Sequence, residues 1–212
     1  MRLLSLNLGQ PHTYEWNGEP VETGIFKHAV AGPVALEKLY FAGDGQADLR
    51  VHGGPDKAVY AYDTAHYAYW QQELGASWTD WQPGLFGENL TTAGLLETEV
   101  RIGDLFGLGT ARLRAAQPRF PCFKLNLRFA DAEMVRRFSR AGRPGIYFRV
   151  EEPGTVQAGD AITRLEAAET SITIAHINDL ILQLPAANTP VSEALALPYL
   201  AESVKRQLRR RV

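Results

Sequence analysis

EVRIGDLFGLGTARLRAA, residues 99–116, contains three short hydrophobic runs at 99–102, 105–108 and 111–116. Only two residues separate each run from the next, and each pair includes a glycine, which commonly ends a strand. A repeat of strand, helix and parallel strand needs a helix between most of its strands, and no helix fits these gaps. The stretch therefore predicts a mainly β fold, of the barrel or sandwich type.

Similar strand-like runs occur in the rest of the chain, and two predicted helices interrupt them. Residues 2–8 alternate hydrophobic and polar side chains, and residues 34–41, 146–150 and 161–165 are further predicted strands. One helix should start at Asp63 and Thr64 and end before Gly75, and another should follow Asp131 and end before Gly142, because Asp caps helix starts and Gly ends helices.

The character of the chain changes after residue 165. Residues 173–184, 191–200 and 201–209 are each predicted to be a short helix, with proline or small polar residues between them. We therefore predict two domains, a β domain at residues 1–169 and a three-helix unit at residues 170–212.

The composition limits the classes of partner. The 212 residues are 45% hydrophobic and carry a net charge of −2, so nothing in the overall charge favours a nucleic-acid polymer or a membrane surface as partner. The N-terminus meets polar residues and proline too early for a signal peptide, and no run is long enough to span a membrane. A single cysteine is typical of a reducing compartment, which predicts a cytoplasmic location.

That cysteine, Cys122, is the main candidate for chemistry. It lies between Pro118-Arg119-Phe120-Pro121 and Phe123-Lys124, so two cations flank it in the sequence. Positive charge favours the thiolate, the form that binds soft metals and attacks electrophiles. A small buried side chain is the alternative role.

Two glycine-containing stretches are candidate ligand loops. The stretch 50–60 contains Arg50, His52, Gly53, Gly54, Asp56 and Lys57. The glycines allow a ligand to approach closely, and the cations suit a phosphate. The same residues also make an ordinary turn. Residues 86–95 place Gly87, Glu88 and Asn89 together, and Lys27 follows another glycine turn.

Two other site types fit these residues poorly. A zinc site built from His52, His66, Cys122, Asp56 and Glu88 lacks the closely spaced ligand pairs of structural zinc. A hydrolase with Cys122 as nucleophile and His52 as base lacks an evident third group to orient the histidine.

Five motifs taken together resemble the MOSC proteins of the YiiM type. They are His52 to Lys57, His66 to Trp70, Phe86 to Leu90, Gly103-Asp104 and Gln117 to Leu125, in this order and spacing. The resemblance covers nearly the whole chain and includes a trailing three-helix unit. It implies a MOSC-type β-barrel that binds the molybdenum cofactor, with Cys122 as the metal ligand and the catalytic thiol.

The resemblance also implies an activity, the reduction of N-hydroxylated base analogues such as 6-hydroxylaminopurine to the amine. Because the chain shows no flavin or nicotinamide motif, a separate flavoprotein reductase is expected to supply electrons, and an oligomer is possible. Lys27, Arg50, Lys57, Arg119 and the Gly53-Gly54 turn are the candidates for the cofactor phosphate, with Gly87, Glu88, Asn89 and Lys124 also in the site. His52, Asp56 and Glu88 are the candidate proton donors, and the sequence does not rank them beyond the near-neutral titration of histidine.

Two alternative functions use the same site. A sulfur carrier would hold a persulfide on Cys122 and pass the sulfur on. A non-enzymatic module would bind the cofactor, with its helical tail docking a partner.

Overall fold

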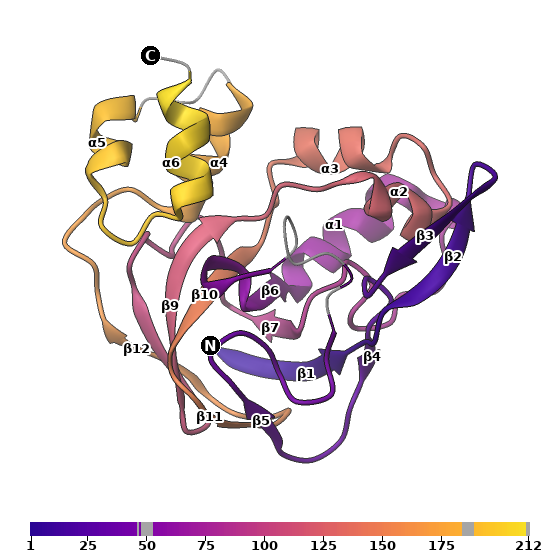
Figure 1. Cartoon of the computed structure of the whole chain (residues 1–212), viewed down its shortest axis with the longest axis horizontal. Helices are drawn as coiled ribbons and strands as arrows, with labels where there is room; N and C mark the ends of the chain where they lie inside the picture. The colour runs from indigo at the N-terminus through magenta and orange to yellow at the C-terminus, as the bar shows by residue number, and fades with distance from the viewer. Residues whose placement is uncertain (46, 48–52, 184–188, 211–212) are drawn as a thin grey trace.

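A mixed eight-stranded sheet forms the centre of the molecule, which a computed structural model describes at residues 1–45, 47, 53–183 and 189–210 (Figure 1). Its strand order is β12-β8-β9-β10-β6-β7-β1-β4, and β5 with β11 and β2 with β3 form separate pairs. Among the described strands, β6 and β7 pair in parallel and the other pairs are antiparallel. The mainly β prediction is therefore confirmed.

The bounds of the elements are as follows. The strands are β1 (Arg2–Leu8), β2 (His12–Trp16), β3 (Glu19–Thr23), β4 (His28–Ala29), β5 (Val34–Leu36), β6 (Val59–Asp63), β7 (Leu90–Ala93), β8 (Leu105–Leu108), β9 (Ala111–Pro118), β10 (Ile146–Glu152), β11 (Gly154–Val156) and β12 (Ile162–Glu166). The helices are α1 (Thr64–Leu74), α2 (Phe123–Phe129), α3 (Met134–Ala141), α4 (Ile174–Leu182), α5 (Val191–Ala196) and α6 (Glu202–Arg209), with short 3-10 turns η1 (Pro55–Lys57) and η2 (Gly75–Ser77).

The sheet does not close into the predicted barrel within the described part of the chain. Its end strands, β12 and β4, do not pair with each other. The residues before β12 reach β1 through a single bridge between Arg2 and Ala161, and the Leu3 amide donates to the Asp160 carbonyl at 3.0 Å. One edge of β1 pairs with β7. On the other edge, the last residues of β1 pair with β4. Only the start of β1 is thus free to meet this segment, and the sheet stays open.

Both helices predicted in the first domain are present. Asp63 caps α1 by accepting a hydrogen bond from the Ala65 amide at 3.0 Å, and Gly75 ends the helix with φ of 52°. The Asp131 carboxylate accepts from the Glu133 amide at 2.8 Å, and α3 ends at Gly142 with φ of 63°. The predicted cap is therefore correct for α1. In α3 the N-cap position is Glu133, without a side-chain cap, so Asp131 lies in the turn just before the helix.

Three predicted elements differ from the structure. Residues 99–102 are a turn with a single bridge from Arg101 to Thr173, because the Asp104 carboxylate accepts the Arg101 amide at 3.0 Å. Of residues 34–41, only Val34–Leu36 pair with β11, after which the chain turns back. The helix expected at 191–200 ends at Ala196, since Leu197 precedes a proline and such a residue disfavours helical geometry.

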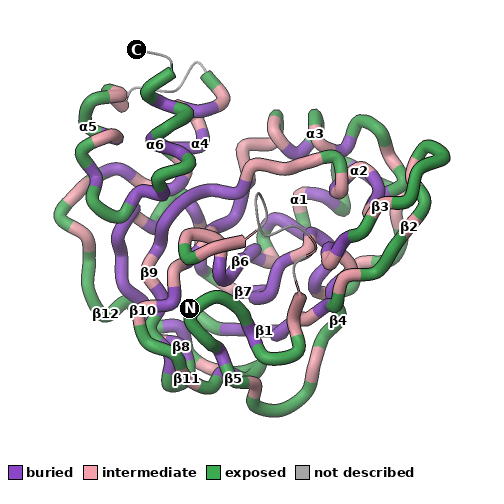
Figure 2. Tube along the Cα trace, in the orientation of Figure 1, coloured by how far each residue is buried: buried purple, intermediate pink, exposed green. Residues whose placement is uncertain are grey.

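Two hydrophobic clusters lie on opposite faces of β6. Val59 and Ala61 belong to the main cluster, whereas Tyr60 and Tyr62 belong to an aromatic cluster with Trp70 of α1. This division follows from the alternation of side chains along a strand. Figure 2 shows β6 buried throughout and the β2–β3 hairpin largely exposed.

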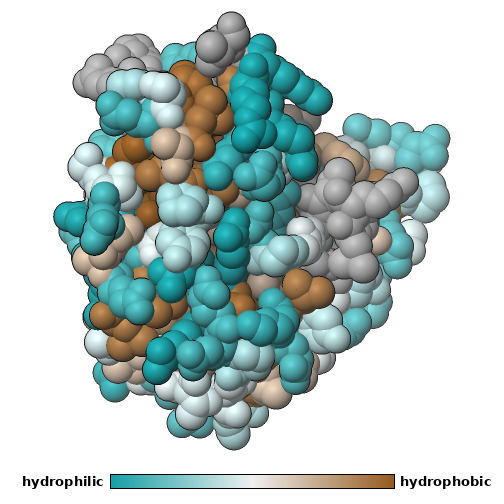
Figure 3. All heavy atoms as spheres, turned by 60° about the vertical axis from the view of Figure 1, so that its left-hand side comes forward, coloured by the Kyte–Doolittle hydropathy of each residue, from teal (hydrophilic) through white to brown (hydrophobic). Residues whose placement is uncertain are grey.

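The C-terminal helices share the main cluster with the sheet. Ile177 of α4 and Leu208 of α6 are both fully buried within it, and α4 packs against β9. Figure 3 shows apolar surface towards the top of the face that carries these helices. The boundary between residues 169 and 170 remains a prediction. In the described part of the chain, no helix is both long and apolar enough to cross a membrane.

Candidate active site

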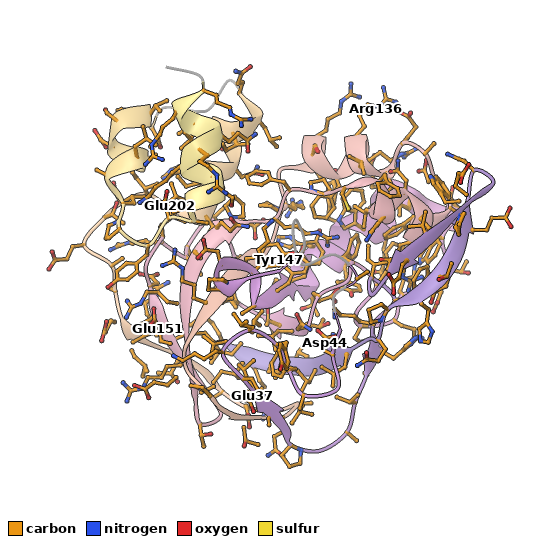
Figure 4. The ribbon with its side chains drawn as sticks, in the orientation of Figure 1. Glu37, Asp44, Arg136, Tyr147, Glu151 and Glu202 are labelled. Carbon is orange, nitrogen blue, oxygen red and sulfur yellow. The ribbon has the colours of Figure 1, made fainter. Side chains whose placement is uncertain are left out.

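A pocket beside β6 and β10 collects most of the residues that the sequence singled out. The residues that line it are Thr23, Gly24, Ile25, Lys27, Asp44, Gly45, Ala47, Lys57, Tyr60, Gly87, Asn89, Arg119, Phe120, Cys122, Lys124 and Tyr147. Figure 4 labels two of its residues, Asp44 and Tyr147, in the central part of the view, whereas the labels of Glu37, Glu151, Glu202 and Arg136 lie around them. The sheet thus brings together segments that are far apart in sequence.

One wall of the pocket is a buried ion-pair network around Asp44. Lys27 forms a hydrogen-bonded ion pair with Asp44. Asp44 also accepts the Asn89 side-chain amide at 2.8 Å and the Gly9 amide at 2.9 Å. Burial lowers the pKa of Lys27, and the neighbouring Asp44 charge opposes this shift. The network fixes Asn89 and Lys27 at the pocket surface.

Arg119 and two tyrosines form another part of the lining. The Arg119 guanidinium donates to the Phe86 carbonyl and lies over the Tyr60 ring, 4.8 Å from its centroid. Tyr60 and Tyr147 are cross-strand partners on β6 and β10, with ring centroids 4.9 Å apart. Burial acts to lower the pKa of Arg119, whereas Tyr60 and Tyr147 act to raise it. The net effect is a raised pKa. A permanently charged guanidinium therefore faces the pocket.

Cys122 also lines the pocket, at the start of α2, and is only partly buried. It interacts electrostatically with Lys57, Arg119 and Tyr147. Burial lowers the pKa of Lys57, while Asp56 and Cys122 act to raise it. Lys124 also lines the pocket. The thiol of this chain therefore lies in a cationic pocket, as the flanking sequence predicted.

Several candidate residues lie elsewhere. Asp56 pairs with Arg149 and does not line the pocket. Gly53 and Gly54 also lie outside the lining, and Gly54 precedes η1 with φ of 86°. Arg50 and His52 fall outside the described residues. Within the described residues, no group of three His, Cys, Asp or Glu side chains could hold a metal ion.

Glu88 is buried behind the pocket wall. Its carboxylate accepts hydrogen bonds from the Tyr67 hydroxyl, from Thr91 at 2.8 Å, and from the Gly84 and Phe86 amides at 2.9 and 3.1 Å. Burial raises its pKa, and the hydrogen bonds from Tyr67 and Thr91 oppose the rise. Glu88 therefore holds the loop that presents Gly87 and Asn89, and it does not itself line the pocket.

The sequence reasoning missed the contributions of Asp44 and Tyr147. Asp44 follows β5 in a turn and shows no motif, because its role depends on Lys27 and Asn89 from distant segments. Tyr147 lies in a run that reads as an ordinary strand. The alternation along β10 does place Tyr147 on the opposite face from Ile146 and Phe148, which are both buried, and this was the available signal.

Replacing Lys57 by Met is expected to slow alkylation of Cys122 by iodoacetamide at neutral pH roughly threefold or more, because a nearby cation favours the reactive thiolate. The rate is measured by mass spectrometry. Lys38→Met is the control, since the Lys38 ammonium bonds to carbonyls of Val150 and Glu151 and does not line the pocket. Equal alkylation rates in both variants and the unmodified protein would show that Lys57 does not act on the thiol.

Comparison with known proteins connects this arrangement to one family. The model of the MOSC domain matches residues 48–163. The uncharacterized protein YflK of Bacillus subtilis (strain 168) is 42% identical over 201 residues, which cover 95% of this chain and 90% of YflK. Protein YiiM of Escherichia coli (strain K12) is 34% identical over 92% of this chain and 85% of its own length.

Two further matches bear on activity and fold. A protein named reductase from Gibberella moniliformis (strain M3125 / FGSC 7600) is 32% identical over 92% of this chain, which corresponds to only 35% of the reductase. The crystal structure of YiiM from Geobacillus stearothermophilus superposes with a TM-score of 0.80 at 30% identity, covering 99% of this chain and 98% of that one.

Proposed function

Because the chain belongs to the MOSC domain family and is homologous to YiiM, we propose that it reduces N-hydroxylated compounds with the molybdenum cofactor. In this proposal Cys122 is a ligand of the molybdenum, and base analogues such as 6-hydroxylaminopurine are the substrates. A separate flavoprotein delivers the electrons. The observation that carries the proposal is the convergence of the only cysteine of the chain with cations from distant segments in one pocket.

The residues in the pocket fit the cofactor by their chemistry. A thiolate is a soft ligand, which suits a metal that is already held by sulfur. Lys57, Arg119 and Lys124 suit a phosphate, and Gly24 and Gly87 also line the pocket. Lys27 contributes less positive charge than the sequence implied, because Asp44 pairs with it.

The reaction consumes two electrons and two protons. It breaks the N–O bond of the substrate, leaving an amine and water. The bound cofactor would supply the electrons. The protein would bind the substrate, exclude bulk water and deliver protons, and the partly exposed ring of Tyr147 offers apolar surface to a planar base.

The similarity to a protein named reductase supports a redox activity. The match covers about a third of that protein. If other parts of the reductase deliver electrons, this chain would need a separate donor, as we propose.

The proposal is tested by turnover. Protein purified from a host that makes the cofactor is expected to convert 6-hydroxylaminopurine to adenine with reduced methyl viologen as the electron donor, measured by chromatography. The chemical donor removes any need for the natural partner. Cofactor-loaded protein without turnover on this and other N-hydroxylated compounds would instead support a binding module. Protein without molybdenum that carries a Cys122 persulfide would support a sulfur carrier.

A further inference from the structure

Two neighbouring tyrosines in the pocket have hydroxyl groups in different situations. Tyr60 and Tyr147 face each other across β6 and β10 and both line the pocket. The Tyr60 hydroxyl donates to the Pro144 carbonyl at 2.8 Å, so its proton is already engaged. The Tyr147 hydroxyl makes no hydrogen bond with another residue in the described part of the chain. The Tyr147 oxygen is not one of the buried polar atoms that lack a hydrogen-bond partner. Because it has no partner among the described residues, it is accessible, and Tyr147 lines the pocket.

Arg119 is the neighbour that favours proton donation by Tyr147. Burial raises the pKa of Tyr147, and Arg119 opposes the rise. The phenol therefore stays protonated at neutral pH. When it gives up its proton, the Arg119 guanidinium on the same wall stabilises the phenolate. Tyr147 and Cys122, the residue that is proposed to hold the metal, line the same pocket.

The other described candidates for this role are engaged elsewhere. Asp56 pairs with Arg149, and Glu88 accepts hydrogen bonds from its own loop behind the wall. Neither lines the pocket. Among the described lining residues, Lys57 is the main competitor, because it also lies near Cys122.

We propose that the Tyr147 hydroxyl is the general acid of the reduction, an inference that rests on the function proposed above. As the N–O bond breaks, the Tyr147 proton moves to the departing oxygen, which leaves as water. The bound cofactor would supply the two electrons, and an external reductant such as a flavoprotein or reduced viologen would replace them. The nitrogen takes the second proton from solvent, and solvent reprotonates Tyr147.

The test compares Tyr147→Phe with Tyr69→Phe, a control that removes a hydroxyl outside the pocket. Turnover by Tyr147→Phe is expected to fall about 100-fold, a typical contribution of general acid catalysis. Its residual rate should fall about tenfold for each unit of rising pH, because hydronium must replace the phenol. The control should match the unmodified protein. A Tyr147→Phe rate within about threefold of the unmodified protein, with the same pH profile, would overturn the proposal.

Two readouts are independent of turnover. Tyr147→Phe should retain its molybdenum and its melting temperature, because the hydroxyl bonds to no described residue, whereas Tyr60→Phe should melt lower because it loses the bond to Pro144. A lower melting temperature for Tyr147→Phe would contradict the free hydroxyl. If the turnover rate falls with rising pH in Lys57→Gln but not in Tyr147→Phe, Lys57 and not Tyr147 is the general acid. Turnover by the unmodified protein is measured separately, so failure of this inference is distinguishable from failure of the proposed function.

Discussion

Removal of residues 170–212 is expected to leave a chain that neither unfolds cooperatively nor binds the cofactor. The deleted part buries ten hydrophobic side chains in the cluster that it shares with the sheet: Ile172, Ile174, Ile177, Ile181, Ala194, Leu197, Leu200, Ala201, Val204 and Leu208. Burying one large hydrophobic side chain stabilises a protein by about 1.5–3 kcal/mol. Whole domains are stable by only about 5–15 kcal/mol, so the loss exceeds what the sheet can tolerate.

The deletion should also disturb the site through β9. The Ala201 amide donates to the Ala116 carbonyl at 3.3 Å, and the Ser203 hydroxyl donates to Gln117 at 3.2 Å. The chain continues from Gln117 to Arg119 and Cys122. The helical unit thus supports the strand that leads into the pocket.

Circular dichroism during urea unfolding and molybdenum analysis measure both effects. Arg206→Ala is the control, because this exposed side chain should change the free energy of unfolding by no more than about 0.5 kcal/mol. A chain of residues 1–169 that unfolds cooperatively and binds the cofactor as the whole protein does would show that the tail is a separate docking unit.

The sequence located elements that local chemistry defines. Asp63 and Gly75 marked the ends of α1, and the alternation in residues 111–116 marked most of β9. The Asn17-Gly18 pair is a hairpin signal of the same local kind, and it joins β2 and β3 with φ of 53° and 80°. Elements defined by distant contacts were harder to predict. α2, for example, begins directly after Cys122 with no side-chain cap.

The candidate site shows the same division. Cys122, Lys57, Arg119, Lys124, Lys27, Gly87 and Asn89 were singled out from their sequence neighbours, and the fold places all seven around one pocket. Glu88 and Asp56 come from the same motifs, but their carboxylates satisfy neighbouring loops and strands instead. Whether a side chain faces the pocket depends on tertiary packing, which a motif does not specify.

Replacement of Cys122 by Ala or Ser is expected to remove molybdenum and abolish reduction of 6-hydroxylaminopurine. Ala lacks a donor atom, and the Ser hydroxyl is a hard and largely protonated ligand that replaces a soft thiolate. The side chain is partly exposed at the pocket, so the loss of its sulfur should leave the fold intact. Unchanged melting temperatures would separate a loss of metal from a loss of structure.

Metal analysis of the unmodified protein and Cys122→Ala, both purified from a host that makes the cofactor, tests the central claim most directly. We predict stoichiometric molybdenum in the unmodified protein and little in the variant, at equal melting temperatures. Equal molybdenum in both proteins would contradict the role of Cys122 as metal ligand, and its absence from both would contradict cofactor binding itself.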